Sequence, residues 1–160
     1  MNNRERDLLI DKLAESYTDT RMLIEGIDLD ICVYTDAEWR IKDIIGHVTT
    51  WDRQVIRSLN AFIAGIEYSI PELEEDSFNQ QQVLEKRNMT ASQVFIDAEQ
   101  ARKDFIEAVR EIPLDRFPGD LLYPWGDERG SIVTLVEYMI DHEHEHRDEI
   151  VKAIQASNEN

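Results

Sequence analysis

The chain has 160 residues, of which 42% are hydrophobic and 32% are charged. A chain of roughly 150 residues buries about 70% of its unfolded surface around one core, so we expect a single domain over residues 1–160. Asp and Glu number 34 against 17 Lys and Arg, which gives a formal net charge of -17. This charge would repel phosphate groups, and it therefore argues against nucleic acid and anionic membranes as partners.

The sequence has no apolar run of 18 residues and no basic segment followed by an apolar one, so we expect a soluble, cytoplasmic protein. The single cysteine, Cys32, cannot form an intramolecular disulfide or a cysteine-rich zinc site. We also find no Ser-His-Asp or Cys-His pattern, no phosphate-binding loop and no G-x-G-x-x-G. The catalytic residues, if the protein is an enzyme, therefore stay unassigned.

Apolar residues three or four positions apart predict a first amphipathic helix over residues 3–27. The sequence TDAE at 35–38 has the spacing of a capping box and predicts the start of a second helix, which runs to about Gly65. The apolar face of this second helix is formed by Ile41, Ile44, Val48, Trp51, Val55, Leu59 and Phe62.

Helical periodicity fades over residues 66–89, which predicts a long connection with a short helix around 80–85. TASQ at 90–93 is a second capping box, and the helix that follows ends before Pro113. A loop rich in Pro and Gly precedes Ser131, the expected N-cap of a fourth helix to about Ala156. The chain is therefore predicted to be all-α, an up-and-down four-helix bundle with long connections between helices 2 and 3 and between helices 3 and 4. A crossover in these connections stays open.

Three of the four histidines alternate in MIDHEHEHRDEI, residues 139–150, a pattern compatible with a strand, a solvated tail or a metal site. On a helix, His142 and His146 continue the apolar stripe that includes Met139 and Ile150. His144 lies about 200° around the helix from His142, so it is expected to face solvent. A pair of histidines at positions i and i+4 is thus predicted to point into the bundle.

His47 follows Ile44 by three residues and precedes Trp51 by four, which places it on the apolar face of the second helix. A buried imidazole without partners costs about 1 to 3 kcal/mol, so three inward histidines need a shared explanation. We predict that His47, His142 and His146 bind one divalent metal ion with coordination positions left open, as in catalytic zinc sites. Core histidines without a metal are the alternative.

Three imidazoles suit zinc, nickel, copper or iron, and we expect zinc or nickel. Metal-bound imidazoles usually donate their second N–H to a carboxylate or a carbonyl. Asp43, one turn before His47, and Glu143, beside His142, are the candidates for this role.

WRIKDIIGHVTTWDRQV in the second helix and HEHEHRDEI in the fourth resemble the DinB-like superfamily of four-helix bundles over nearly the whole chain. The family pattern Trp-x-x-x-Asp-x-x-x-His-x-x-x-Trp is matched by Trp39, Asp43, His47 and Trp51. The pattern His-x-x-x-His-Arg is matched by His142, His146 and Arg147. The resemblance implies that the three histidines are the metal ligands.

The resemblance also implies a homodimer and a thiol-dependent transferase or isomerase, which uses a low-molecular-weight thiol against small electrophiles. Here Glu145 replaces the first histidine of the commoner family ending His-His-Arg-Gly-Gln, and Asp148 and Glu149 replace Gly-Gln. DSFNQQQVLEKRNMTASQV before the third helix is closer to a neighbouring branch, which includes self-protection hydrolases that need not use a metal.

The loop sequence LLYPWGD places Tyr123 and Trp125 as candidate walls of a substrate pocket, together with Asn79 and Trp51. Arg147 is expected to pair with a carboxylate. The leading hypothesis is a metal-dependent enzyme that activates a bound thiolate or water against a small electrophile. The alternatives are a metal-free hydrolase and a non-enzymatic dimeric binding protein.

Overall fold

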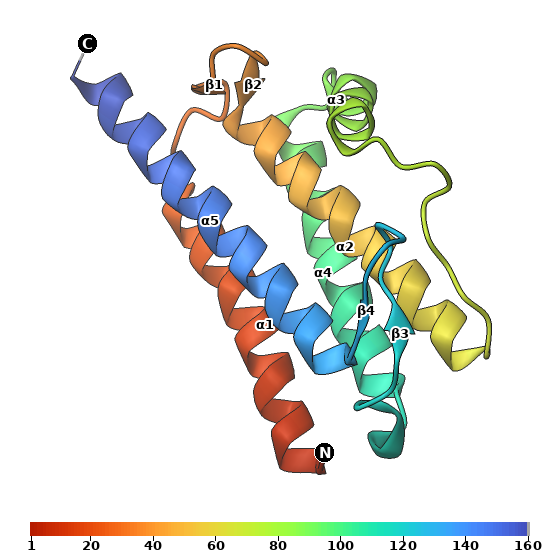
Figure 1. Cartoon of the computed structure of the whole chain (residues 1–160). Helices are drawn as coiled ribbons and strands as arrows, with labels where there is room; N and C mark the ends of the chain where they lie inside the picture. Colours follow the sequence, from red (N-terminus) through yellow and green to blue (C-terminus); the bar gives the residue numbers. More distant parts are fainter. Residues whose placement is uncertain (160) are drawn as a thin grey trace.

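The computed structural model describes residues 1–159, and its four long helices pack as a bundle (Figure 1). The predicted all-α four-helix bundle with two long connections is therefore confirmed. A fifth, short helix lies in the connection between the second and third long helices (Figure 1). The helices are α1 Asn3–Leu23, α2 Ile41–Ile63, α3 Glu75–Lys86, α4 Ala91–Glu111 and α5 Ile132–Asn158.

Two short antiparallel hairpins flank the bundle. In the first, β1 Cys32–Tyr34 pairs with β2 Trp39–Arg40 directly before α2. In the second, β3 Leu121–Leu122 pairs with β4 Arg129–Gly130 directly before α5. A single 3-10 turn, η1 Leu114–Arg116, separates α4 from the second hairpin.

The long helices form two parallel pairs rather than a simple up-and-down series (Figure 1). Helices α1 and α5 run in one direction, and α2 and α4 run in the other. Each of α1 and α2 packs against both α4 and α5, so the first two long helices lie diagonally opposite each other. The reversal is possible because the connection after α2 carries the chain back along the bundle before α4 begins (Figure 1).

The predicted capping box at Thr35–Glu38 is wrong, because this segment turns between β1 and β2. Glu38 has a φ of 55°, which is incompatible with a helical first turn. Helix α2 instead starts at Ile41, where the carboxylate of Asp43 accepts the backbone N–H of Arg40 at 2.9 Å. The predicted caps Thr90 and Ser131 are confirmed, since each side chain accepts a backbone N–H in the first turn of its helix.

Two apolar clusters fill the bundle, one toward each end. The cluster near the start of α1 includes Leu13, Trp51, Phe105 and Met139, and the other includes Ile24, Ile44, Ala98 and Ile150. On each long helix, polar residues lie at or next to the boundary between the residues of the two apolar clusters. These polar residues are Ser16, His47, Asp52, Arg102, His142, Glu143 and His146, and they form a polar layer across the middle of the bundle.

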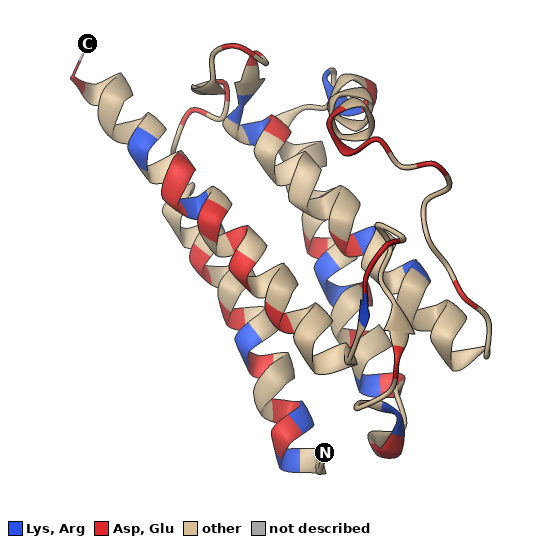
Figure 2. Ribbon diagram, viewed as in Figure 1, with Lys and Arg blue, Asp and Glu red and all other residues tan. Residues whose placement is uncertain are grey.

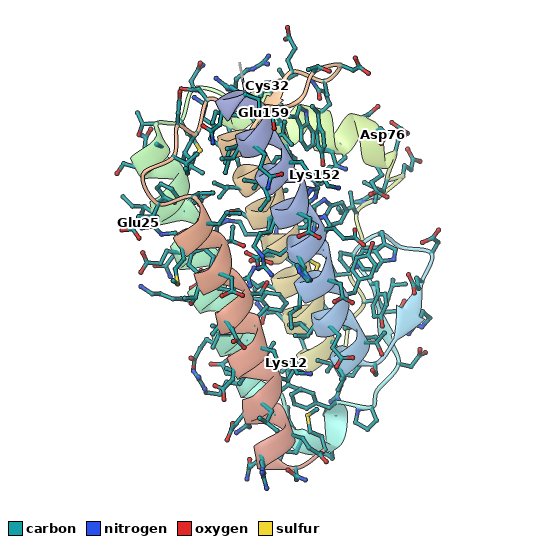
Figure 3. The ribbon with its side chains drawn as sticks, turned by 90° about the vertical axis from the view of Figure 1, so that its left-hand side faces the viewer. Lys12, Glu25, Cys32, Asp76, Lys152 and Glu159 are labelled. Carbon is teal, nitrogen blue, oxygen red and sulfur yellow. The ribbon has the colours of Figure 1, made fainter. Side chains whose placement is uncertain are left out.

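Acidic residues are frequent on the exposed face of α5 (Figure 2). In the side view, side chains fill the space between the helices, and the exposed Cys32 lies near the end of α5 (Figure 3). No helix within residues 1–159 combines the length and the apolar character that a membrane span needs.

Candidate metal centre

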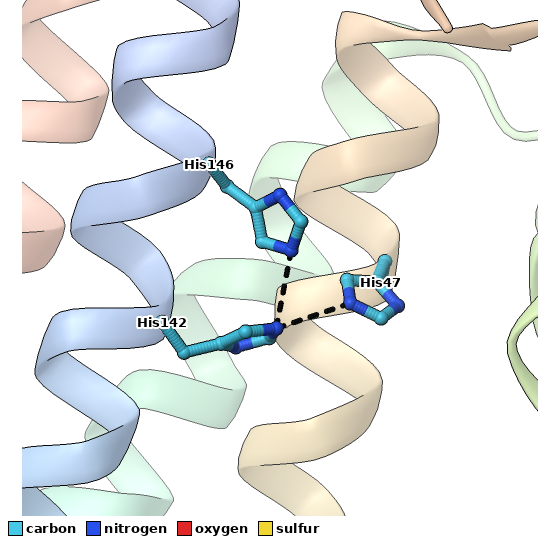
Figure 4. A group of neighbouring side chains, drawn as sticks. All are labelled: His47, His142 and His146. Atoms are coloured by element: carbon cyan, nitrogen blue, oxygen red, sulfur yellow. Dashed lines mark hydrogen bonds between the residues drawn. The ribbon is translucent and has the colours of Figure 1, made fainter. Parts of the chain in front are cut away.

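The three inward histidines meet in the gap between α2 and α5 (Figure 4). His142 Nε2 lies 3.2 Å from His47 Nε2 and 3.1 Å from His146 Nε2. The rings of His47 and His146 are nearly perpendicular, with centroids 5.0 Å apart. His144, on the same helix, is exposed. The predicted convergence of His47, His142 and His146 is thus present in the structure.

The geometry follows from the packing of two helices. His142 and His146 are one turn apart on α5, so their side chains extend from the same face. His47 is on α2, which runs antiparallel to α5 and is packed against it (Figure 1). Ile44 and Trp51, one turn to either side of His47, are buried in the two apolar clusters and hold the helix in register.

The surroundings of His47 and His142 keep these two imidazoles unprotonated. Burial, together with the neighbouring imidazoles of His146 and His142, lowers the pKa of His47 well below its usual value. Burial and the imidazole of His146 also lower the pKa of His142 to about 4. Both side chains are therefore neutral at pH 7, which is the state in which imidazole binds a metal ion.

Two of the three nitrogen separations in the centre fit ligands of one metal ion. Two nitrogens bound to the same ion through bonds of about 2.0 to 2.1 Å must lie about 3 Å apart. The two measured separations, 3.2 and 3.1 Å, agree with this value. Of the buried polar atoms that the structure describes, His142 Nδ1 is one of the few without a hydrogen-bond partner, so this ring is held through packing and its Nε2 contacts.

Two residues that the sequence analysis did not identify contact the outer nitrogen of His146. Glu149 Oε2 lies 2.7 Å from His146 Nδ1, and the Tyr34 hydroxyl oxygen lies 3.2 Å from the same atom. The Tyr34 hydroxyl also donates a hydrogen bond to Glu149. A carboxylate in this position holds the proton on Nδ1 and leaves Nε2 free to bind a metal.

A second polar group in the middle layer is formed by buried ions. The Arg102 guanidinium contacts Asp52 at 3.0 Å and Glu143 at 3.0 Å, and it donates to the carbonyl of Leu13 at 2.8 Å. Ser16 donates to Glu143 at 2.7 Å. This ion cluster, Ser16, Asp52, Arg102 and Glu143, draws one side chain from each long helix. Burial and the carboxylate of Glu143 raise the pKa of Asp52 to about 6, although Arg102 acts against this shift.

The carboxylate of Glu143, which was expected beside the histidines, is part of the ion cluster. Glu143 is buried, and its contacts are with Arg102 and Ser16 rather than with an imidazole. Asp43 is also buried, and its contacts are with the guanidinium and backbone N–H of Arg40.

Arg147 donates to the carbonyl oxygen of Ser16 at 3.1 Å and lies 3.9 Å from the carboxylate of Asp19. Both contacts are with α1, so this side chain ties α5 to α1.

The four candidate wall residues divide into two kinds. Trp51 and Trp125 line a hollow that also borders His142. Asn79 Oδ1 accepts the indole N–H of Trp51 at 3.0 Å and so orients that ring. Tyr123 is buried in the core, and its hydroxyl donates to the carbonyl of Ser131 at 3.2 Å.

The comparisons with known proteins concern the fold and the family. In a search of solved structures, the chain matches YfiT from Bacillus subtilis, described as a probable metal-dependent hydrolase with an unusual four-helix bundle topology. The TM-score is 0.79 at 13% sequence identity, and the match covers 99% of this chain and 90% of the other. A comparison with curated proteins finds no significant match. The model of the DinB superfamily matches residues 12–150, a span that includes all three histidines, and the chain therefore belongs to the DinB superfamily.

Proposed function

We propose that this protein is a metal-dependent hydrolase of small molecules, with a divalent ion held by His47, His142 and His146. The observation that carries the proposal is the convergence of three imidazoles between α2 and α5, two of which, His47 and His142, have lowered pKa values and are neutral at pH 7. The description of YfiT as a probable metal-dependent hydrolase supports the same function for a chain with this fold.

A divalent ion held by these histidines would lower the pKa of bound water and polarise a substrate carbonyl, and both effects would favour hydrolysis near neutral pH. The protein's own residues prepare the site. Glu149 and Tyr34 hold His146 by its outer nitrogen, and Trp39 packs against the ring of His47 with centroids 5.3 Å apart. These contacts fix the positions of two imidazoles before any ligand binds.

The first test is the metal content of the wild-type protein and of three variants, His47→Ala, His142→Ala and His144→Ala. Each protein is incubated with zinc or nickel, freed of excess ion and measured by elemental analysis. We expect close to one ion per chain in the wild type and in the exposed control His144→Ala, and less than about a tenth of that in the other two. Metal retained by His142→Ala would contradict the site.

The second test is turnover of a panel of small esters, amides and lactones with and without a chelator. Hydrolysis that chelation and His142→Ala both abolish supports the proposal. Hydrolysis that survives both changes would assign a metal-free hydrolase. A reaction that needs an added low-molecular-weight thiol would assign thiol transfer instead. Metal binding without any turnover would leave a binding protein.

A further inference from the structure

A hollow of about 220 Å³ lies beside the histidines, between α2, α5 and the β3–β4 hairpin. His142 is one of its lining residues, so a molecule in the hollow would sit next to the candidate metal centre. Liquid water takes about 30 Å³ per molecule, and the hollow is therefore large enough for a small organic group rather than a single water. Its lining decides which group fits.

Three aromatic rings form much of the wall: Trp51, Trp125 and Tyr138. The centroid of the Trp125 ring lies 6.2 Å from that of Trp51 and 5.0 Å from that of Tyr138, and the rings are inclined at 66° and 44°. Tyr138 is part of α5 and is 53% exposed, which is high for a large aromatic side chain on a helix of the bundle. The negative faces of such rings attract cations, and a set of inclined rings can contact one cation from several sides.

The charged residues of the lining are both acidic. Glu75 and Glu128 border the hollow, and no Lys or Arg is present among its described lining residues. Glu128 accepts the indole N–H of Trp125 at 2.9 Å, which places its negative charge at the edge of that ring. Burial and the carboxylates of Glu75, Glu145 and Glu128 raise the pKa of Tyr138, as expected for a ring among negative charges.

We propose that this hollow binds the positively charged amine or ammonium group of the substrate and presents its remainder to the histidine centre. The inference deepens the proposed function and rests on it, because the bound molecule is a substrate only if the protein is a hydrolase. Aromatic walls and carboxylates act together here, because the rings stabilise a cation that has lost part of its hydration and the carboxylates attract it from solution. An anionic substrate group would meet repulsion from both.

The test uses three probes of similar shape and different charge: benzylamine, benzyl alcohol and benzoate. Binding is measured on metal-free protein in about 150 mM salt, so that neither coordination to an ion nor weak attraction to the acidic surface contributes. The readout is the set of indole N–H signals in a two-dimensional NMR titration. Trp51 and Trp125 report on the hollow, and Trp39, whose indole N–H donates to Gln80, is the internal control.

We expect benzylamine to shift the signals of Trp51 and Trp125 at concentrations at least tenfold lower than benzyl alcohol, with no shift from benzoate. Glu128→Gln and Glu75→Gln should each weaken benzylamine binding about threefold or more and leave benzyl alcohol unchanged. The matched control Glu107→Gln removes the same charge from α4, which does not line the hollow, and should have no effect. Trp125→Leu should weaken benzylamine binding about tenfold.

Equal binding of benzylamine and benzyl alcohol, stronger binding of benzoate, or no binding of any probe would each overturn the inference. The outcome is independent of the metal test. A chain that shows metal-dependent hydrolysis but does not prefer benzylamine keeps the proposed function and loses this inference. A chain that prefers benzylamine but binds no metal keeps the cation site and loses the metal-dependent hydrolase.

Discussion

The middle of the bundle holds two polar groups with opposite properties. In the ion cluster, a cation stands between two carboxylates, and Arg102 reaches Asp52, Glu143 and the carbonyl of Leu13. In the histidine centre, His142 Nε2 lies close to the Nε2 atoms of both His47 and His146, and the lowered pKa values of His47 and His142 keep these two rings neutral at pH 7. The charges of the first group are paired within the chain, whereas the three histidines of the second group are the ones that we propose to bind a metal ion. The comparison therefore sets a group that we expect to be structural beside one that we propose to be functional.

The largest expected effect on stability comes from disrupting the ion cluster. Arg102→Met leaves two carboxylates buried without their cation, and we expect it to destabilise the protein by about 3 to 5 kcal/mol. The loss is measured by urea unfolding of the metal-free protein. Replacing Asp52 and Glu143 by Leu in the same chain should recover most of it, because no buried charge then lacks a partner. A loss below about 1 kcal/mol would show that the ion cluster does not depend on Arg102 for its stability.

The second effect on stability is expected from metal binding at the histidine centre. Metal at about 100 times its dissociation constant should raise the free energy of unfolding by about 2.7 kcal/mol, because it binds the folded chain. Thermal unfolding with and without zinc measures the change. His142→Ala should abolish the stabilisation, and the exposed control His144→Ala should keep it. Equal stabilisation of both variants would place the ion elsewhere.

A smaller effect is expected from the contacts outside the centre. Glu149→Gln keeps the shape of the side chain but removes the charge beside His146 Nδ1, and it should weaken metal binding about 10-fold to 100-fold. Competition with a chelator measures the affinity. Asp148→Asn is the matched control, since it removes the same charge from the neighbouring, exposed position. The assignment of Glu149 fails if both variants lose affinity equally.

The pH dependence of stability gives a further test of the comparison. The pKa of His142 is about 4 in the folded protein and about 6.5 in an unfolded chain. Between these values the unfolded chain gains a proton that the folded chain does not, so stability falls as the pH drops from 6.5 toward 4, by up to about 1.4 kcal/mol per unit. Asp52, with its pKa raised to about 6, acts in the opposite direction.

The contributions of His142 and Asp52 to the pH dependence are separated by comparing the wild type with a variant that lacks His142. The unfolding free energy of metal-free His142→Gln is measured beside that of the wild type, because the variant keeps the contribution of Asp52 and loses that of His142. We expect the wild type to lose its stability more steeply below pH 6.5. A difference that stays constant from pH 6.5 to 4.5 would contradict the lowered pKa.

Periodicity was enough to predict the long helices and the inward direction of three histidines. On α5, His142 and His146 continue a stripe whose ends are plainly apolar, and the same argument on α2 places His47. Periodicity could not predict the ion pair of Arg102 and Asp52, because two charged residues far apart in the sequence show no pattern that relates them. Glu143 was expected to contact an imidazole. It follows Met139 by four residues and therefore also faces the interior, where it contacts Arg102 and Ser16.

Other features depend on contacts that local sequence does not encode. The capping-box spacing at Thr35–Glu38 is real, but the strands on either side pair and turn it into a hairpin. That hairpin places Tyr34 beside Glu149, more than a hundred residues later in the chain. The spacing of Glu149 from His146 was visible in the sequence, since residues three apart on a helix are neighbours. The expected homodimer stays a prediction.

The diagonal placement of α1 and α2 also constrains how the chain can fold. Both packing partners of α1 begin after residue 90, so α1 has nowhere to bury its apolar face until more than half of the chain is available. Every long-helix contact that forms the core joins segments distant in the sequence, and closing such large loops slows folding relative to a bundle of sequential hairpins. On the ribosome, α1 must therefore wait for α4 before it can bury its apolar face, and the three histidines come together only after α5 has been synthesised.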